Sequence, residues 1–178
     1  HKLMAIKQIL RIGNPILRQA TESITAFDTP DLHNLIQDMK DTMEANNGAG
    51  LAAIQIGITK QVMIFGIEKN PRYPDVETIP STTIINPKYE VLNKEKEDGW
   101  EGCLSVPGMR GLVPRYKHIR YYGFDEFGAV IEREVTNFHA RVFQHEFDHL
   151  EGVLYPDKIE KKNCFGFIEE LDNSGAFY

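Results

Sequence analysis

The stretch Val142–Gly152, VFQHEFDHLEG, places two histidines four residues apart, with a glutamate directly after the first. Residues i and i+4 lie on one face of an α-helix, about 6 Å apart along its axis, so His145 and His149 can point their imidazoles at one metal ion. Glu146 lies about 100° further round the helix, where it ligates poorly but can reach a water beside the ion. The stretch therefore predicts a central helix that carries two metal ligands and a general base.

A catalytic metal site normally has three protein ligands and one open position, so a third ligand is needed. No histidine follows His149, and two other residues are candidates. Glu169 lies 20 residues after His149, as in hydrolases with a His₂Glu site, which would make the protein an endopeptidase. Cys103, in EGCLSVPG (Glu101–Gly108), offers a thiolate, a strong ligand for soft or borderline metals. Cys164 is expected to be an inert thiol.

A glycine-rich segment, NGAGLAAIQIG (Asn47–Gly57), follows the first predicted helix. Because it does not follow a strand, a dinucleotide-binding loop is disfavoured. Gly48 and Gly50 permit close approach of the backbone to a ligand. Gln55 is a polar residue in an otherwise apolar run, and such a buried amide can donate to a developing oxyanion.

The order of predicted elements is helix, several antiparallel strands, then helix, which indicates an α+β fold with antiparallel sheets packed around the histidine helix. Thr29-Pro30 is a typical helix start, and Asn46 to Gly48 end that helix. Asn137 is expected to cap the histidine helix, which continues to about Leu150. β-Branched and aromatic residues predict strands at Gln61–Ile67, Thr82–Pro87, His118–Asp125 and Ala129–Val135. The remaining expectations are a loop at Asn70–Ser81, a solvated turn at Asn93–Gly99 and a last helix at about Lys161–Leu171.

The length and composition are those of a globular protein with one domain, and residues 1–178 are expected to form it. The metal motif predicts that this domain is catalytic. A net charge of −6 disfavours bulk binding to nucleic acid or anionic membranes, and no apolar stretch is long enough to span a bilayer. Two cysteines cannot form a disulfide framework, which favours a reducing compartment. Met4 is expected to be the natural initiator, with His1–Leu3 as additions. A lost leader would make an organelle matrix the alternative to a bacterial cytoplasm.

Three of the quoted motifs, GAGLAAIQ, EGCLS and QHEFDHLEG, together resemble the signature motifs of peptide deformylases. ILRIGNPILR near the start and VPR (Val113–Arg115) strengthen this resemblance, which covers about Ile6–Ile159. It implies a metal-dependent hydrolase that removes the N-formyl group from the initiator methionine of nascent polypeptides and releases formate.

The resemblance also implies a role for individual residues. The metal ligands would be Cys103, His145 and His149, with Glu146 as base and then acid. The formyl oxygen would be stabilised by the Gln55 amide and the backbone N–H of Leu104. Substrate-binding residues would be Gly50, through its main chain, and Arg110, along the groove. Glu101 and Arg115 resemble the structural ion pair that supports the cysteine segment in the family.

The expected cofactor is one divalent metal ion, Fe²⁺ natively, with Zn²⁺, Ni²⁺ or Co²⁺ as substitutes. The expected partners are N-formylmethionyl nascent peptides, with a transient ribosome contact as a further possibility and a monomer as the favoured state. Neither nucleic acid nor membrane is an expected partner.

The chain departs from many bacterial members just before the first metal-binding histidine. Arg141 lies four residues before His145, where many members carry apolar pocket residues; with Trp100, this pattern is more similar to organelle deformylases and some bacterial ones. Arg141 is expected to be a surface brace for nearby acidic residues. The expected walls of the methionine pocket are Ala49, Phe138 and Val142. The other internal histidines, His33, His118 and His139, are expected to be surface or packing residues.

Overall fold

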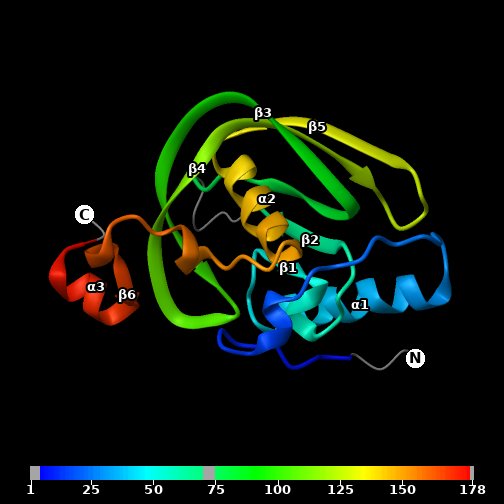
Figure 1. Ribbon diagram of the computed structural model, residues 1–178, viewed down its shortest axis with the longest axis horizontal. Coiled ribbons are helices and arrows are strands. Elements are labelled where there is room, and N and C mark those ends of the chain that lie inside the picture. The colour runs from blue at the N-terminus through cyan, green and yellow to red at the C-terminus, as the bar shows by residue number, and fades with distance from the viewer. Residues whose placement is uncertain (1–4, 70–74, 177–178) are drawn as a thin grey trace.

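The computed structural model describes residues 5–69 and 75–176 (Figure 1). The expected initiator Met4 and residues 1–3 lie outside the described residues, as do positions 70–74 of the expected loop. The helices are α1 (Pro30–Ala45), α2 (Asn137–Leu150) and α3 (Ile168–Ser174). The strands are β1 (Gly50–Ala52), β2 (Val62–Ile67), β3 (Ile79–Cys103), β4 (Val106–Phe124), β5 (Val130–Thr136) and β6 (Phe165–Phe167).

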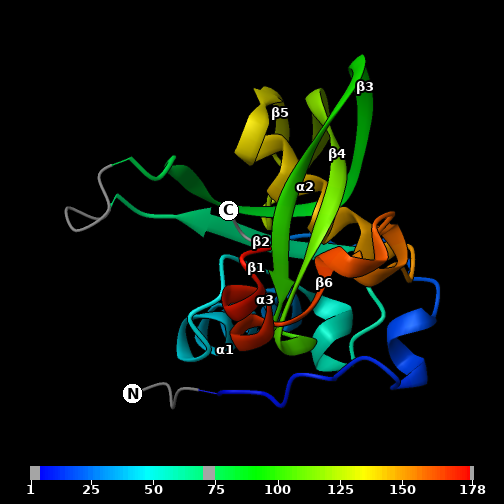
Figure 2. The same ribbon diagram turned by 90° about the vertical axis from the view of Figure 1, so that its left-hand side faces the viewer.

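The strands form an antiparallel sheet in the order β1-β2-β3-β4-β5, with β6 added to β4. The predicted α+β fold with antiparallel strands is therefore confirmed. β3 and β4 are much longer than the others and run together as a bent ribbon beside α2 (Figure 2). Register shifts along β3 mark the bulges at which this ribbon bends. The bend carries the end of β3 towards the face of α2.

β2 has both of its faces covered by helices, which explains its unbroken apolar sequence. Met63 and Phe65 pack in the cluster that includes α2, whereas Val62 and Ile64 pack in the cluster that includes α1. Side chains alternate between faces along a strand, so each helix receives every second residue. α1 begins as predicted, because the Thr29 side chain accepts a hydrogen bond from the Leu32 N–H at 3.2 Å.

α2 packs into the concave side of the sheet through aromatic residues (Figure 1). Phe143 is stacked on Tyr121 of β4, with ring centroids 4.2 Å apart and planes 2° apart, and it contacts Phe65 edge-on. Burying such rings contributes roughly 2–3 kcal/mol each. This packing fixes the rotation of α2 and, with it, the direction in which its histidines point.

The prediction that Asn137 caps α2 is wrong. Thr136 occupies the cap position without a side-chain hydrogen bond, and Asn137 is the first helical residue. Asn137 has a positive φ of 53°, a conformation that asparagine tolerates better than most residues. It therefore turns the chain directly from β5 into α2 without a loop.

Two further expectations are corrected. The charged run Asn93–Gly99 is part of β3 rather than a turn, and β3 begins at Ile79, inside the expected loop. The expected helix at Lys161–Leu171 is a short 3₁₀ turn at Lys162–Cys164, then β6, then α3. β6 pairs with β4 near Arg110, which places the last segment of the chain beside the end of β3.

Candidate metal centre and cavity

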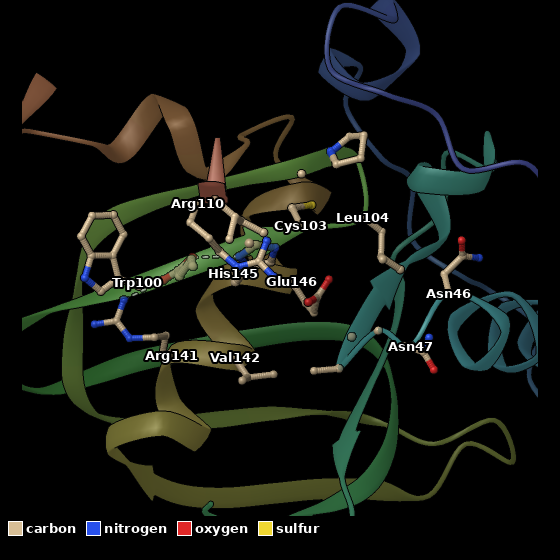
Figure 3. Close-up of a pocket in the computed structure, with 18 of the residues that line it drawn as sticks. Asn46, Asn47, Trp100, Cys103, Leu104, Arg110, Arg141, Val142, His145 and Glu146 are labelled. Atoms are coloured by element: carbon tan, nitrogen blue, oxygen red, sulfur yellow. Dashed lines mark hydrogen bonds and ion pairs between the residues drawn. The ribbon is translucent and has the colours of Figure 1, made fainter. Parts of the chain in front are cut away.

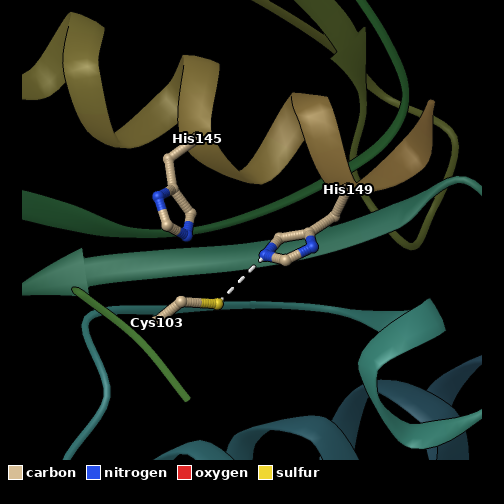
Figure 4. A group of neighbouring side chains, drawn as sticks. All are labelled: Cys103, His145 and His149. Atoms are coloured by element: carbon tan, nitrogen blue, oxygen red, sulfur yellow. Dashed lines mark hydrogen bonds between the residues drawn. The ribbon is translucent and has the colours of Figure 1, made fainter. Parts of the chain in front are cut away.

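The two histidines of α2 project from one face of the helix, as their spacing predicts (Figure 4). The centroids of the His145 and His149 rings are 5.2 Å apart. Both rings lie in the protein interior, where an imidazole without a partner is costly. Burial, followed by the positive neighbours His145 and Arg115, lowers the pKa of His149 well below its ordinary value, which favours the neutral form that binds metals.

Cys103 ends β3 and faces these two rings from the hairpin that leads into β4. Its Sγ lies 3.4 Å from His149 Nε2, and one donor atom from each of the three residues lies within 4.8 Å of the others (Figure 4). Within residues 5–69 and 75–176, this is the one such group of potential metal ligands that was found. Glu169 and Cys164 are not part of it. A thiolate and two imidazoles suit a borderline divalent cation and leave room for a fourth ligand.

The carboxylate of Glu101 lies behind His145 and holds its ring. Glu101 Oε1 accepts from His145 Nδ1 at 2.8 Å, which leaves the opposite ring nitrogen for the cation. Arg115 donates to both carboxylate oxygens at 2.9 Å, so the expected Glu101–Arg115 pair is present. Burial alone would raise the pKa of Glu101, but the hydrogen bonds from Arg115 and His145 hold it well below its usual range. Glu101 is therefore a buried anion that fixes the ligand.

The expectation of a surface position for Arg141 is wrong, because the residue is only 9% exposed. Arg141 Nη1 donates to Glu101 Oε2 and to the Val113 carbonyl, both at 2.7 Å. Its Nη2 donates to the Glu97 carbonyl at 2.6 Å. Arg141 is a brace for an acidic residue, but a buried one.

Gln55 lies in a 3₁₀ turn, Ala53–Ile56, and is 1% exposed. Its Oε1 accepts from the Ala52 N–H at 2.9 Å, which fixes the orientation of the amide. The Nε2 then donates to Ser105 Oγ at 3.0 Å and lies 3.5 Å from Cys103 Sγ. An N–H donor is thus directed at the edge of the metal group.

Glu146 is 4% exposed and lies directly against Gly50. A Cβ on Gly50 would be 2.3 Å from Glu146 Oε2, so the glycine is required for the carboxylate to fit. Burial raises the pKa of Glu146 to about 7, despite the opposing effect of His145. Such a pKa is suited to a group that accepts and donates protons near neutral pH.

A cavity of about 510 Å³ opens onto this group of residues (Figure 3). Its lining includes every residue that the sequence suggested for substrate binding: Ala49, Gly50, Arg110, Phe138 and Val142. Leu104 and Glu146 also line it. The sequence did not suggest the contributions of Asn46, Asn47, Pro107 and Ile168, or that Trp100 would lie on this wall. Most of these residues flank a motif, whereas Ile168 gave no signal in the sequence.

The remaining internal histidines lie outside the metal group, as expected. His33 contacts Asp28 and Glu126, and His118 contacts Glu134. His139 Nε2 lies 2.8 Å from the Tyr121 hydroxyl. Within the part of the chain that the structure describes, no helix is long and apolar enough to cross a membrane.

Comparisons with known proteins match this chain to one family. Residues 6–164 match the family model described as polypeptide deformylase. Peptide deformylase 1 of Nitrosomonas europaea is 56% identical over 93% of this chain and 94% of its own length. Peptide deformylase 1 of Bordetella pertussis is 55% identical over the same shares of the two chains. These relatives are bacterial, and the likeness to the organelle branch stays a prediction.

Solved structures of deformylases share the fold. A class I type b peptide deformylase from Acinetobacter baumannii, bound to Met-Ala-Ser, superposes with a TM-score of 0.81 and 35% identity, covering 88% of this chain and 100% of that one. Peptide deformylase from Thermotoga maritima gives a TM-score of 0.77 and 35% identity, covering 88% and 99%. The chain therefore belongs to the peptide deformylase family, metal-dependent hydrolases that remove the N-formyl group from the initiator methionine of new polypeptides.

Proposed function

We propose that Cys103, His145 and His149 bind one divalent cation and that the cavity beside them receives the formylmethionyl end of a nascent peptide. The observation that carries this proposal is the convergence of one sulfur and two imidazole nitrogens within 4.8 Å at the floor of a 510 Å³ cavity. A bound cation would supply Lewis acidity at the formyl carbonyl and would lower the pKa of the attacking water. The donor set fits such an ion, because Glu101 fixes His145 with its free nitrogen towards the thiol.

Glu146 would then act as the base and afterwards as the acid. Its carboxylate takes a proton from the water that attacks the formyl carbon and gives it to the departing amine, so the products are formate and a peptide with a free amino terminus. The raised pKa of Glu146 supports both transfers near neutral pH. Gln55 Nε2 and the backbone N–H of Leu104 would stabilise the negative charge on the formyl oxygen.

The peptide would lie along the cavity wall. The main chain of Gly50 would pair with the peptide backbone, and Arg110 would contact the residues that follow methionine. Ala49, Phe138 and Val142 would surround the methionine side chain. These assignments are supported by the position of each residue in the cavity lining. The Acinetobacter baumannii relative, crystallised with Met-Ala-Ser, is consistent with a peptide in this place.

Several finer assignments belong to the same proposal. Ferrous iron would be the native ion. Zinc, nickel or cobalt could replace it, because thiolate and imidazole ligands accept all four. One copy of the chain would suffice, since all the proposed ligands come from residues 103–149, and residues 1–178 would act as one catalytic domain. Because the substrate is made on ribosomes, the protein would act in a bacterial cytoplasm, with an organelle matrix as the alternative. It would also contact the ribosome transiently.

The direct test is release of formate from formyl-Met-Ala-Ser under anaerobic conditions, after iron, nickel or zinc has been restored. Glu146→Ala should keep its metal and lose turnover by about 10²- to 10⁴-fold, since it removes only the proton transfer. Cys103→Ala should lose metal, whereas Glu169→Ala should keep both metal and activity. Full activity in Glu146→Ala would show that Glu146 is not the base. Metal loss in Glu169→Ala with retention in Cys103→Ala would contradict the ligand assignment and favour the endopeptidase.

A further inference from the structure

We propose that Arg141 is a positioning residue for the metal centre, acting through Glu101 to hold both His145 and the strand that carries Cys103. This inference rests on the proposed function, because it concerns the same site. Among the described residues, the hydrogen bonds of Arg141 go to Glu101, Val113 and Glu97. None of them goes to a proposed metal ligand or to Glu146. Its effect must therefore pass through the groups that it holds.

The hydrogen bonds of Glu101 divide between its two oxygens. Oε1 accepts from His145 Nδ1 and from Arg115 Nη2, while Oε2 accepts from Arg115 Nε and from Arg141 Nη1. Each oxygen thus has two charge-assisted or ring N–H donors, and the carboxylate cannot rotate without breaking one. Arg141 is one of the two donors to the oxygen on the side away from His145, together with Arg115.

The two acids and two arginines of this buried cluster carry balanced charges. Glu101 and Asp148 are the acids, and Arg115 bridges them with one hydrogen-bonded contact to Asp148 and two to Glu101. When His145 is neutral, as a metal ligand is, Arg115 alone would leave one uncompensated negative charge in the interior, which is strongly unfavourable. Arg141 supplies the second positive charge at 2.7 Å.

Arg141 also ties three elements together. The side chain comes from α2 and donates to Glu97 and Glu101 of β3 and to Val113 of β4. Gly99 makes room for the guanidinium, because a Cβ there would lie 2.7 Å from Arg141 Cζ. β3 ends at Cys103 and α2 carries both histidines, so this contact fixes the sulfur-bearing strand relative to the nitrogen-bearing helix.

Two effects oppose each other when Arg141 is removed. Loss of a positive charge strengthens the attraction of the site for a cation, whereas loss of orientation weakens it. Arg141 lines both the 510 Å³ cavity and a neighbouring one of about 410 Å³, so water can enter the vacated space and screen the exposed carboxylate. Loss of such supporting groups typically lowers metal affinity by about 10- to 100-fold. The orientation effect should therefore dominate.

The test compares the rate at which cobalt-loaded proteins lose their ion to excess chelator, together with the thiolate-to-cobalt absorption bands. Arg141→Met should release cobalt about tenfold faster or more, with shifted bands. Arg141→Lys, which keeps the charge but not the planar fork, should be intermediate. Arg120→Met, which removes an exposed arginine of β4 that pairs with Glu90, should match the wild type. Unchanged or slower release from Arg141→Met would overturn the proposal.

A second arm tests whether the effect passes through Glu101. Arg141→Met should change cobalt release clearly less in the Glu101→Gln background than in the wild type, because the main group that transmits the effect is already altered and only the bonds to the Glu97 and Val113 carbonyls remain. Effects that multiply would overturn the proposal. If Arg141→Met does not unfold cooperatively and is therefore not properly folded, the Arg141→Lys variant replaces it in the test. Cobalt release from Arg141→Lys at the wild-type rate would then contradict the role of Arg141. A wild-type protein that binds no cobalt, or yields no formate, would instead contradict the proposed function.

Discussion

Gly50 shows how a single residue controls the chemistry proposed for its neighbour. A Cβ at this position would collide with the Glu146 carboxylate, with 2.3 Å to Oε2 and 2.7 Å to Cδ. Glycine can also approach a peptide backbone closely, which fits the proposed pairing with substrate. The same position thus serves both the base and the peptide.

Gly50→Ala should therefore displace Glu146 and lower kcat by about 10²-fold, because a shift of about 1 Å in a catalytic group has a cost of that order. Metal content should not change, because the three heavy atoms nearest to a Cβ at this position all belong to Glu146. Gly166→Ala is the matched control, because a Cβ there would meet Leu171 at an ordinary 3.8 Å. Steady-state kinetics, together with metal analysis of each variant, would test this prediction. A wild-type kcat in Gly50→Ala would show that Gly50 does not constrain the position of Glu146.

At the residue scale, the sequence anticipated the groups whose chemistry depends on spacing. The four-residue interval between His145 and His149 dictates a shared helix face, and the apolar run around Gln55 indicates a buried amide. The expected surface position of Arg141 is wrong, although charged residues are mostly exposed. Its burial depends on Glu101, which is 40 residues away, and a local pattern does not reveal such a partner.

At the scale of elements, α2 meets β4 through a polar contact inside an aromatic cluster. His139 of α2 lies 2.8 Å from the Tyr121 hydroxyl, which also accepts from Arg133 at 3.1 Å. The hydroxyl proton is therefore available to a neutral imidazole. Burial, followed by the nearby positive charge of Arg133, lowers the pKa of His139 to about 4.

This pKa makes part of the stability depend on pH. An unfolded histidine titrates near 6.5, so the unfolded state binds more protons between about pH 6.5 and 4. The contribution of His139 is thus present above pH 6.5 and is lost as the pH falls towards 4. Because the residue is only partly buried, we expect a loss on the order of 1–2 kcal/mol.

Urea unfolding of His139→Gln should show a smaller decrease in the free energy of unfolding between pH 6.5 and 4 than the wild type. Glutamine can still accept from Tyr121 but does not titrate. His118→Gln, at an exposed contact with Glu134, provides a comparison on the same sheet. Identical pH dependences for His139→Gln and the wild type would refute the role of His139.

The elements that sequence patterns misassigned are those that tertiary contacts decide. Asn93–Gly99 is exposed and highly charged, which is typical of a turn. It nevertheless belongs to β3, and its backbone pairs with β4 in the two-stranded ribbon. Cross-strand contacts such as Lys96 over the Tyr116 ring, 4.8 Å from its centroid, support the strand there. Apolar periodicity finds strands that cover a core, and this segment covers none.

At the scale of the whole molecule, the cavity draws its walls from segments distant in the sequence. Asn46 and Asn47 follow α1, and Trp100 lies on β3 (Figure 3). Ile168 begins α3. β6 places Ile168 there by pairing with Met109–Gly111 of β4. The C-terminal segment therefore belongs to the cavity, although its sequence gave no indication of this.

Ile168→Asp should raise KM for formyl-Met-Ala-Ser by about 3- to 10-fold with little change in kcat, because it places a charge on an apolar wall away from the proposed metal ligands. Glu170→Gln, on the exposed side of the same helix, is the control. An unchanged KM in Ile168→Asp would mean that the substrate does not reach α3.

The fold as a whole brings the end of β3 against one face of α2, where a single cation would bind to both. X-ray absorption spectroscopy of the metal-loaded protein tests this most directly. We predict one sulfur and two imidazole nitrogens in the first coordination shell of the wild type and of Cys164→Ala. Cys103→Ala should bind metal poorly, and any ion that excess metal restores to it should have no sulfur ligand. A first shell without sulfur, or one that keeps its sulfur in Cys103→Ala, would contradict the account.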